Sequence, residues 1–159
     1  MAQKSRRVVL VVFPGVQTLD AAGPAEVFGM AGYEVVTAST SGGEALTTSG
    51  LVLRTRQLGR VRPGSRDTVV VAGGGEGAIR RAAADRALRQ WLRRASGVVE
   101  RLASVCSGAF LLASVGLLDG KRATTHWSAA DRLAELRPQV QVEAEAIYIQ
   151  QGKVWTSAG

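Results

Sequence analysis

Short apolar runs alternate with amphipathic segments along most of the chain. Each run has the length and the β-branched content of a buried strand, and each ends at a turn signal such as Pro14-Gly15. The pattern predicts strands at residues 8–13, 33–39, 68–72 and 98–105, with a short extra strand at 51–56 and another at 122–125. Residues 140–150 and 153–157 predict a final pair of strands around a turn at Gln151-Gly152.

The segments between these runs have helical spacing. Apolar side chains recur at one helical face from Ile79 to Leu92, with arginines mostly on the other face, which predicts a helix there. Further helices are predicted at 19–30, 107–118 and 128–136. Pro24 is expected near the first turn of the first of these, where a proline is tolerated.

Strands that alternate with helices favour a single α/β domain over residues 1–159. We predict a flavodoxin-like, doubly wound, mainly parallel sheet inside a three-layer α/β/α sandwich. The chain ends on a predicted strand, so we expect this domain to lack its last covering helix and the native protein to continue. Sites in such sheets lie beyond the carboxyl ends of the strands, which here points to the loops 14–20, 73–77, 106–107 and 125–127.

The composition is 46% hydrophobic and 21% charged, as in soluble globular proteins, and no apolar run is long enough to span a membrane. The segment 1–7 is followed by a strand rather than a cleavage site, so no signal peptide is expected. One cysteine excludes an intrachain disulfide and a multi-Cys zinc site, and it favours the cytoplasm. The net charge of +7 comes mainly from arginines scattered without aromatic neighbours, which does not favour a nucleic-acid surface.

The most informative stretch surrounds Cys106, where an apolar strand runs directly into a small-residue helix. This order is typical of a nucleophile elbow, in which a strained turn presents the side chain at the sheet edge. A helix N-terminus would lower the pKa of the thiol, and the Ser107 N–H together with a donor from Gly74 or Gly75 could hold an oxyanion. The alternative is that Cys106 is a small buried apolar residue.

Three further residues could serve the thiol. His126, the only histidine, ends a predicted strand and could act as a general base, or it could simply pack half-buried against Trp127. Asp20 could cap the first helix, place a carboxylate beside the sulfur, or do both. Glu26, further along the same helix, is the rival carboxylate. No nucleotide-binding fingerprint is present, and we expect neither a metal nor a cofactor.

Four segments together resemble the ThiJ/PfpI superfamily, which has a class I glutamine-amidotransferase-like fold: residues 13–28, 71–75, 105–110 and 116–127. The ending Gly152–Gly159 is most similar to the N-terminal domain of GlxA-type regulators of the AraC family, which continue into a DNA-binding region. The resemblance extends to isonitrile hydratases. It implies Asp20 and Cys106 as the catalytic pair, with Ser107 where those enzymes have Thr. Protease-like members carry His after the cysteine, and glyoxalase-like members carry Glu at the position of Asp20.

The resemblance leaves three functions open. The first is a ligand-sensing, homodimeric domain of a transcription regulator, which would contact DNA only through a C-terminal region outside these residues. The second is a stand-alone hydrolase or hydratase acting on a small molecule through Cys106. The third is a redox sensor in which the sulfur of Cys106 is oxidised.

Overall fold

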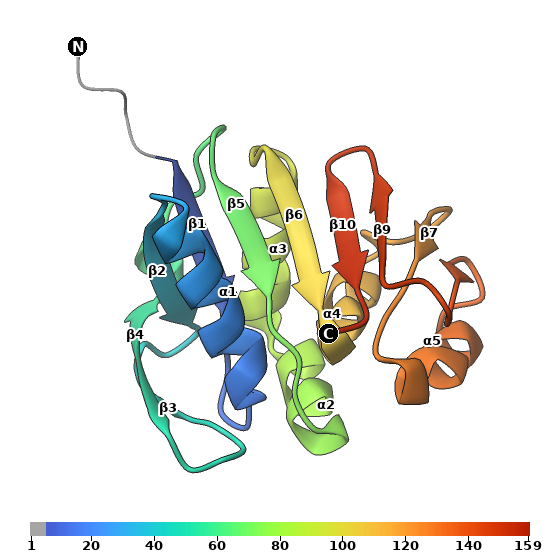
Figure 1. The fold of residues 1–159 in the computed structure, drawn as a ribbon, viewed down its shortest axis with the longest axis horizontal. Coiled ribbons are helices and arrows are strands. Elements are labelled where there is room, and N and C mark those ends of the chain that lie inside the picture. The colour runs from blue at the N-terminus through green and yellow to red at the C-terminus, as the bar shows by residue number, and fades with distance from the viewer. Residues whose placement is uncertain (1–5) are drawn as a thin grey trace.

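The computed structural model describes residues 6–159, so most of the segment 1–7, for which no signal peptide is expected, lies outside the described residues. Eight strands form one sheet in the order β3-β4-β2-β1-β5-β6-β10-β9, seen in Figure 1. The pairs from β4 through β10 are parallel, and the two outer pairs are antiparallel. The predicted mainly parallel α/β fold is therefore confirmed. The strands are β1 (Arg7–Val11), β2 (Glu34–Ser39), β3 (Gly43–Leu46), β4 (Val52–Gln57), β5 (Thr68–Val71), β6 (Arg101–Val105), β9 (Tyr148–Gln151) and β10 (Val154–Ser157).

Helices lie on both faces of this sheet (Figure 1). The helix α1 (Thr18–Met30) covers one face, and α3 (Arg86–Ser96) and α4 (Ala109–Ser114) cover the other. The central strand β5 is buried along its whole length because both its faces are covered. Alternate residues of β1 divide between two apolar clusters, with Val8 and Leu10 on one side and Val9 and Val11 on the other. In the described residues, no helix has both the length and the apolar character that a membrane crossing needs.

The helix predicted around residues 79–92 is two helices. The chain forms α2 (Glu76–Ala84) and then α3, and it is extended at Asp85 between them, with φ −68° and ψ 109°. The Asp85 carboxylate accepts hydrogen bonds from the N–H groups of Ala87 and Leu88 at 2.9 and 3.2 Å. An aspartate in the middle of a helical pattern here marks an N-cap, which the apolar spacing alone does not reveal.

The predicted strand at 140–150 is also wrong as a single element. It consists of β8 (Gln141–Val142), which pairs with β7 (Arg122–Ala123) in a separate two-stranded sheet, and of β9. The intervening segment is irregular, and the buried Thr124 hydroxyl donates to its Ala146 carbonyl at 3.1 Å. The strand β3 was not predicted, because it is short, begins with Gly43 and directly follows Gly42.

The other two predicted helices are shorter than expected. Residues 107–118 form the single turn η2 (Cys106–Gly108) and then α4, which ends two residues before Gly116 at φ 80°. Residues 128–136 form η3 (Trp127–Ala129) and then α5 (Ala130–Leu136). A further single turn, η1 (Leu58–Arg60), follows β4.

Candidate active site

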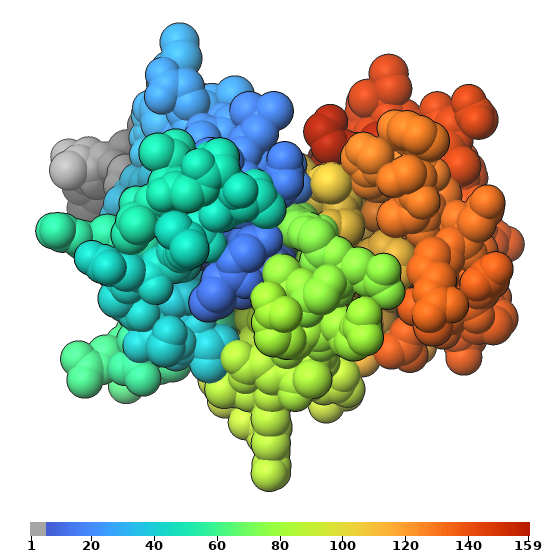
Figure 2. Space-filling view, turned by 90° about the horizontal axis from the view of Figure 1, so that it is seen from below, coloured from blue at the N-terminus to red at the C-terminus, as the bar shows by residue number. Residues whose placement is uncertain are grey.

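Three chain segments meet at the carboxyl edge of the sheet. Asp20 lies in the first turn of α1, Gly73 follows β5, and Cys106 follows β6 directly. A methyl group built on Gly73 would lie 2.6 Å from Asp20 Oδ2, 2.8 Å from Ser107 N and 2.9 Å from Cys106 Cβ. Figure 2 shows this edge of the molecule, with the yellow surface near the end of β6 between the green α2 region and the orange region around η3. The structure thus brings together the segments around Asp20, Gly73 and Cys106, which the sequence predicts at one edge of the sheet.

The backbone at Cys106 is strained. Its φ is 52°, and within residues 6–159 it is the one non-glycine residue with a positive φ. The following helix packs tightly against the end of β5, because a methyl group on Gly108 would lie 2.3 Å from the Val71 carbonyl oxygen. The buried Thr125 hydroxyl donates to the Cys106 carbonyl at 2.8 Å. The surrounding structure thus holds Cys106 in a left-handed conformation at the turn between β6 and α4.

Asp20 faces the thiol and does not cap its helix. The helix begins at Thr18, with Gln17 at the N-cap and no side-chain cap, so the predicted capping role is wrong. Instead, the Asp20 carboxylate accepts a hydrogen bond from the Gly73 N–H at 3.2 Å. Pro24 lies in the helix interior rather than its first turn, four residues after Asp20. A proline has no N–H to donate, so it cannot form the backbone bond to the Asp20 carbonyl that a helix would normally place there.

The Asp20 carboxylate disfavours the thiolate form of Cys106, whereas the thiol favours the charged form of Asp20. Burial raises the pKa of the Cys106 thiol, the negative charge of Asp20 raises it further, and the Ser107 N–H opposes this by hydrogen bonding to the sulfur. Burial also raises the pKa of Asp20, against the opposing effect of hydrogen bonds from the Cys106 thiol and the Gly73 N–H. The expected low thiol pKa is therefore wrong, because desolvation and a neighbouring carboxylate outweigh the short helix. A hydrogen bond between the thiol and the carboxyl group joins the two residues, and the pKa of each is raised.

Ser107 joins the elbow to the glycine loop. Its hydroxyl donates to the Gly74 carbonyl at 2.8 Å and accepts from the Gly74 N–H at 2.9 Å. The Gly73 N–H is bound to Asp20 and the Gly74 N–H to Ser107, so neither is free to hold an oxyanion. The Ser107 N–H points to the sulfur, and Gly75 is left as the candidate second donor. The sequence did not indicate that the Ser107 hydroxyl would form hydrogen bonds with both the N–H and the carbonyl of Gly74.

His126 lies near this pair without joining it by a hydrogen bond. Its ring is half-buried, its Nδ1 lies 2.8 Å from the Ser128 hydroxyl oxygen, and it packs on Trp127 with ring centroids 5.5 Å apart. The charge of His126 contributes the smallest of the effects that lower the pKa of Asp20, so the ring is within electrostatic range of the site. Glu26, the rival carboxylate, is exposed. Sequence reasoning missed Thr125 as a support, although its position in one of the candidate loops was a signal.

Residues 6–159 contain no group of three or more His, Cys, Asp and Glu side chains that could share a metal ion. The polar groups that the structure brings together at this edge are the Cys106 thiol, the Asp20 carboxylate and backbone N–H groups. These are sufficient for the addition of a nucleophile to a polarised carbon, with the carboxylate moving the proton.

Curated relatives of this chain include regulators and an enzyme. It is 35% identical to the HTH-type transcriptional regulator CdhR of Pseudomonas aeruginosa over 76% of this chain and 34% of that protein. It is 34% identical to the regulator GlxA of Rhizobium meliloti over 80% of this chain and 38% of that protein. It is 28% identical to the isonitrile hydratase of Pseudomonas putida over 96% of this chain and 65% of that protein. The chain thus spans little more than a third of the regulators and about two thirds of the enzyme.

A protein from the cpoL upstream region of Streptomyces lividans is 37% identical over 87% of this chain and 99% of its own length. Among solved structures, a ThiJ/PfpI family protein from Pseudomonas syringae superposes with a TM-score of 0.86 at 26% identity, covering 99% of this chain and 64% of that one. The family model described as DJ-1/PfpI matches residues 6–159. The resemblance predicted from the four sequence segments is confirmed, and the chain belongs to the DJ-1/PfpI family.

Proposed function

We propose that this domain captures a small electrophilic molecule at Cys106 and that this capture is the input signal of a GlxA-type regulator of the AraC family. The observation that carries the proposal is the positive φ of Cys106 beside the Asp20 carboxylate. A left-handed cysteine costs about 1–3 kcal/mol of strain, and a carboxylate next to a half-buried thiol adds to that cost. A site that is maintained at such a cost is typical of function rather than of packing.

The resting protonation state defines the class of ligand. In the proposed resting state the thiol keeps its proton and Asp20 carries the negative charge, so an anion would be repelled and a neutral electrophile would not. In the reaction, the thiol proton passes to Asp20, the sulfur lone pair forms a carbon–sulfur bond, and the ligand's multiple bond takes the proton back from Asp20. The net change is the addition of S–H across one multiple bond. It needs no oxidant and is reversible, which suits a sensor.

Regulation is favoured over turnover by the relatives that carry this domain. CdhR and GlxA are transcriptional regulators by name, and this chain covers 34% and 38% of their lengths. In such a protein the present domain would sense the ligand as a homodimer, and a region outside these residues would bind DNA. The sequence encoded after Gly159 provides a simple check, because a reading frame that ends within one further helix would exclude this role.

A second function, hydration of an isonitrile, is favoured by the shared proton of Asp20 and Cys106. The isonitrile hydratase of Pseudomonas putida aligns with 96% of this chain. Addition of the thiol to an isonitrile carbon would give a thioimidate. Water would then add to that carbon, and departure of the sulfur with its proton restored would release an N-substituted formamide. Ser107 supplies an N–H donor to the sulfur in both steps.

One experiment separates these two functions. The protein is incubated with a simple alkyl isonitrile, and both the intact protein mass and the formamide are measured. A sensor forms at most one adduct per chain, whereas a hydratase forms formamide in excess over protein. Both outcomes require loss of the signal in Cys106→Ser and in Asp20→Asn, and no change in Glu26→Gln, which alters an exposed carboxylate on the same helix. An adduct or product that survives in Cys106→Ser would refute the whole proposal.

A further inference from the structure

A cavity of about 380 Å³ lies between β1, β4 and the segment that follows β4. It is lined by Arg7, Arg56, Gln57, Arg60 and Val61, and it shares no residue with the Cys106 site. Its volume falls within the range of about 300–1,000 Å³ that is common for small-molecule sites. The composition of its lining is unusual, because three of the five residues are arginines.

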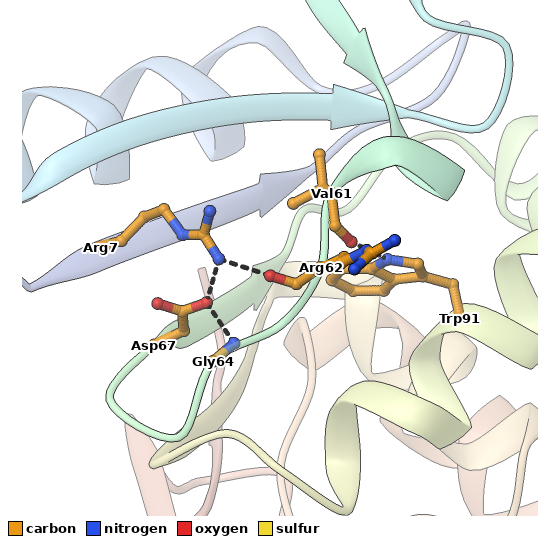
Figure 3. Close-up of polar contacts among 6 residues, drawn as sticks. All are labelled: Arg7, Val61, Arg62, Gly64, Asp67 and Trp91. Carbon is orange, nitrogen blue, oxygen red and sulfur yellow. Dashed lines mark hydrogen bonds and ion pairs between the residues drawn. The ribbon is translucent and has the colours of Figure 1, made fainter.

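Hydrogen bonds connect the residues along one wall of this cavity to their surroundings, as Figure 3 shows. The Nη2 of Arg7 donates to the Arg62 carbonyl at 2.6 Å and to Asp67 Oδ2 at 2.5 Å. The buried Trp91 indole donates to the Val61 carbonyl at 2.8 Å. The segment that carries Val61 and Arg62 is therefore fixed to β1 at one point and to α3 at another. A preorganised wall loses little conformational entropy when a ligand binds.

The cavity carries excess positive charge. Asp67 is the carboxylate in contact with Arg7, and it also accepts the Gly64 N–H at 2.7 Å. Arg56 and Arg60 are exposed, and neither forms an ion pair with another residue in the range 6–159. Both contacts that hold Arg7 use Nη2, so the Nε–H and Nη1–H groups remain as separate single donors toward a ligand. After Asp67 is paired with Arg7, two guanidinium charges remain uncompensated.

We propose that this cavity binds the phosphate group of a small molecule. A phosphate monoester carries a charge of about −1.5 to −2 at neutral pH, which matches the two uncompensated arginines. Guanidinium groups bind phosphate oxygens through paired N–H donors, and three of them around one concave site can surround a single group. The lining residues enclose a single cavity, which suits a terminal phosphate better than the continuous backbone of a nucleic acid. The proposal is independent of the chemistry at Cys106.

The test is a titration of the protein with inorganic phosphate at constant ionic strength, followed by the backbone amide signals of Gln57 and Val61 in NMR spectra. Saturable shifts are expected, and Arg56→Gln and Arg60→Gln should each weaken binding about tenfold or more. Both arginines are exposed, so neither change should unfold the protein. Arg132→Gln removes the same charge from the exposed surface of α5 and should leave the titration unchanged.

Equal shifts with sodium chloride, or an unchanged titration in Arg56→Gln and Arg60→Gln, would overturn the proposal. A further arm identifies the source of the phosphate. A sugar phosphate should compete with inorganic phosphate, and a short DNA duplex at the same phosphate concentration should not. Competition by the duplex that is stronger than competition by the sugar phosphate, and that depends on Arg56 and Arg60, would replace the small molecule with nucleic acid and refute the proposal.

Discussion

The substitution Gly73→Ala tests how closely the site is packed. The added methyl group would lie 2.6 Å from Asp20 Oδ2, 2.8 Å from Ser107 N and 2.9 Å from Cys106 Cβ. These distances are shorter than van der Waals contact, and one of the three atoms is backbone. Asp20 is the group that can move, so we expect its carboxylate to be displaced from the Gly73 N–H. In the wild type it accepts a hydrogen bond from that N–H at 3.2 Å.

The size of the effect follows from two costs. Overpacking by one methyl group costs about 1–3 kcal/mol, and loss of a hydrogen bond to a charged group adds about 1.5 kcal/mol or more. Because the carboxylate is only half-buried and water can replace part of its bond, we take the lower part of this range. Gly73→Ala should therefore lower the free energy of unfolding by about 2–3 kcal/mol.

Urea unfolding of Gly73→Ala and Gly75→Ala provides the assay. A methyl group on Gly75 meets no atom within 4 Å, so its cost should be limited to about 0.5–1 kcal/mol for the poorer N-cap of α2. In an Asp20→Ala background, the penalty of Gly73→Ala should shrink by about 1 kcal/mol, because the nearest obstacle is gone. Equal stability of the two alanine variants, or no coupling to Asp20, would refute the packing described here.

Three other substitutions test the supports of the site. Ser107→Ala should lower the free energy of unfolding in urea by about 1–3 kcal/mol, because it leaves the N–H and the carbonyl of Gly74 without their partner. Ser107→Thr keeps a hydroxyl and should retain most of the stability. Equal stability of the two variants would contradict the role of the Ser107 hydroxyl. Thr125→Val should lower the free energy of unfolding by a similar amount, because it removes the donor to the Cys106 carbonyl, whereas Thr125→Ser keeps that donor and should not. A Thr125→Val variant as stable as the wild type would show that this hydrogen bond does not support the turn. Because the pKa of Asp20 is raised in the folded state, its protonation stabilises the fold. This stabilisation is fully present at pH values below the ordinary pKa of Asp and is lost as the pH rises through the pKa of the folded state. The stability of the wild type relative to Asp20→Asn should therefore fall as pH increases from the acid range, and a constant difference would count against it.

Much of the fold could be predicted because the central strands are continuous apolar runs. Residues 68–71 are buried on both faces, and their continuous apolar run predicts a strand. By contrast, β3 and β8 are held by pairing with other strands and have no apolar pattern of their own. At Asp85 the apolar pattern predicts a continuous helix where the structure has a break. The side chain of Asp85 ends one helix and begins another, and a helical apolar period continues through it.

The candidate site was predictable in its members and less so in its electrostatics. Strand order brings Asp20 and Cys106 to one edge, and the order of strand, cysteine and small residues indicates the elbow. The direction of the thiol pKa depends on burial and on the distance to Asp20, which only the folded structure supplies. The same holds for His126, whose ring is bound to Ser128 rather than to the sulfur.

The central claim is that the Cys106 thiol and the Asp20 carboxylate share one proton. The rate of alkylation of Cys106 as a function of pH measures this most directly, since only the thiolate reacts. The wild type should show a midpoint above the ordinary thiol range, and Asp20→Asn should lower that midpoint, because it removes the adjacent negative charge. A midpoint in Asp20→Asn that is equal to or higher than that of the wild type would contradict the account.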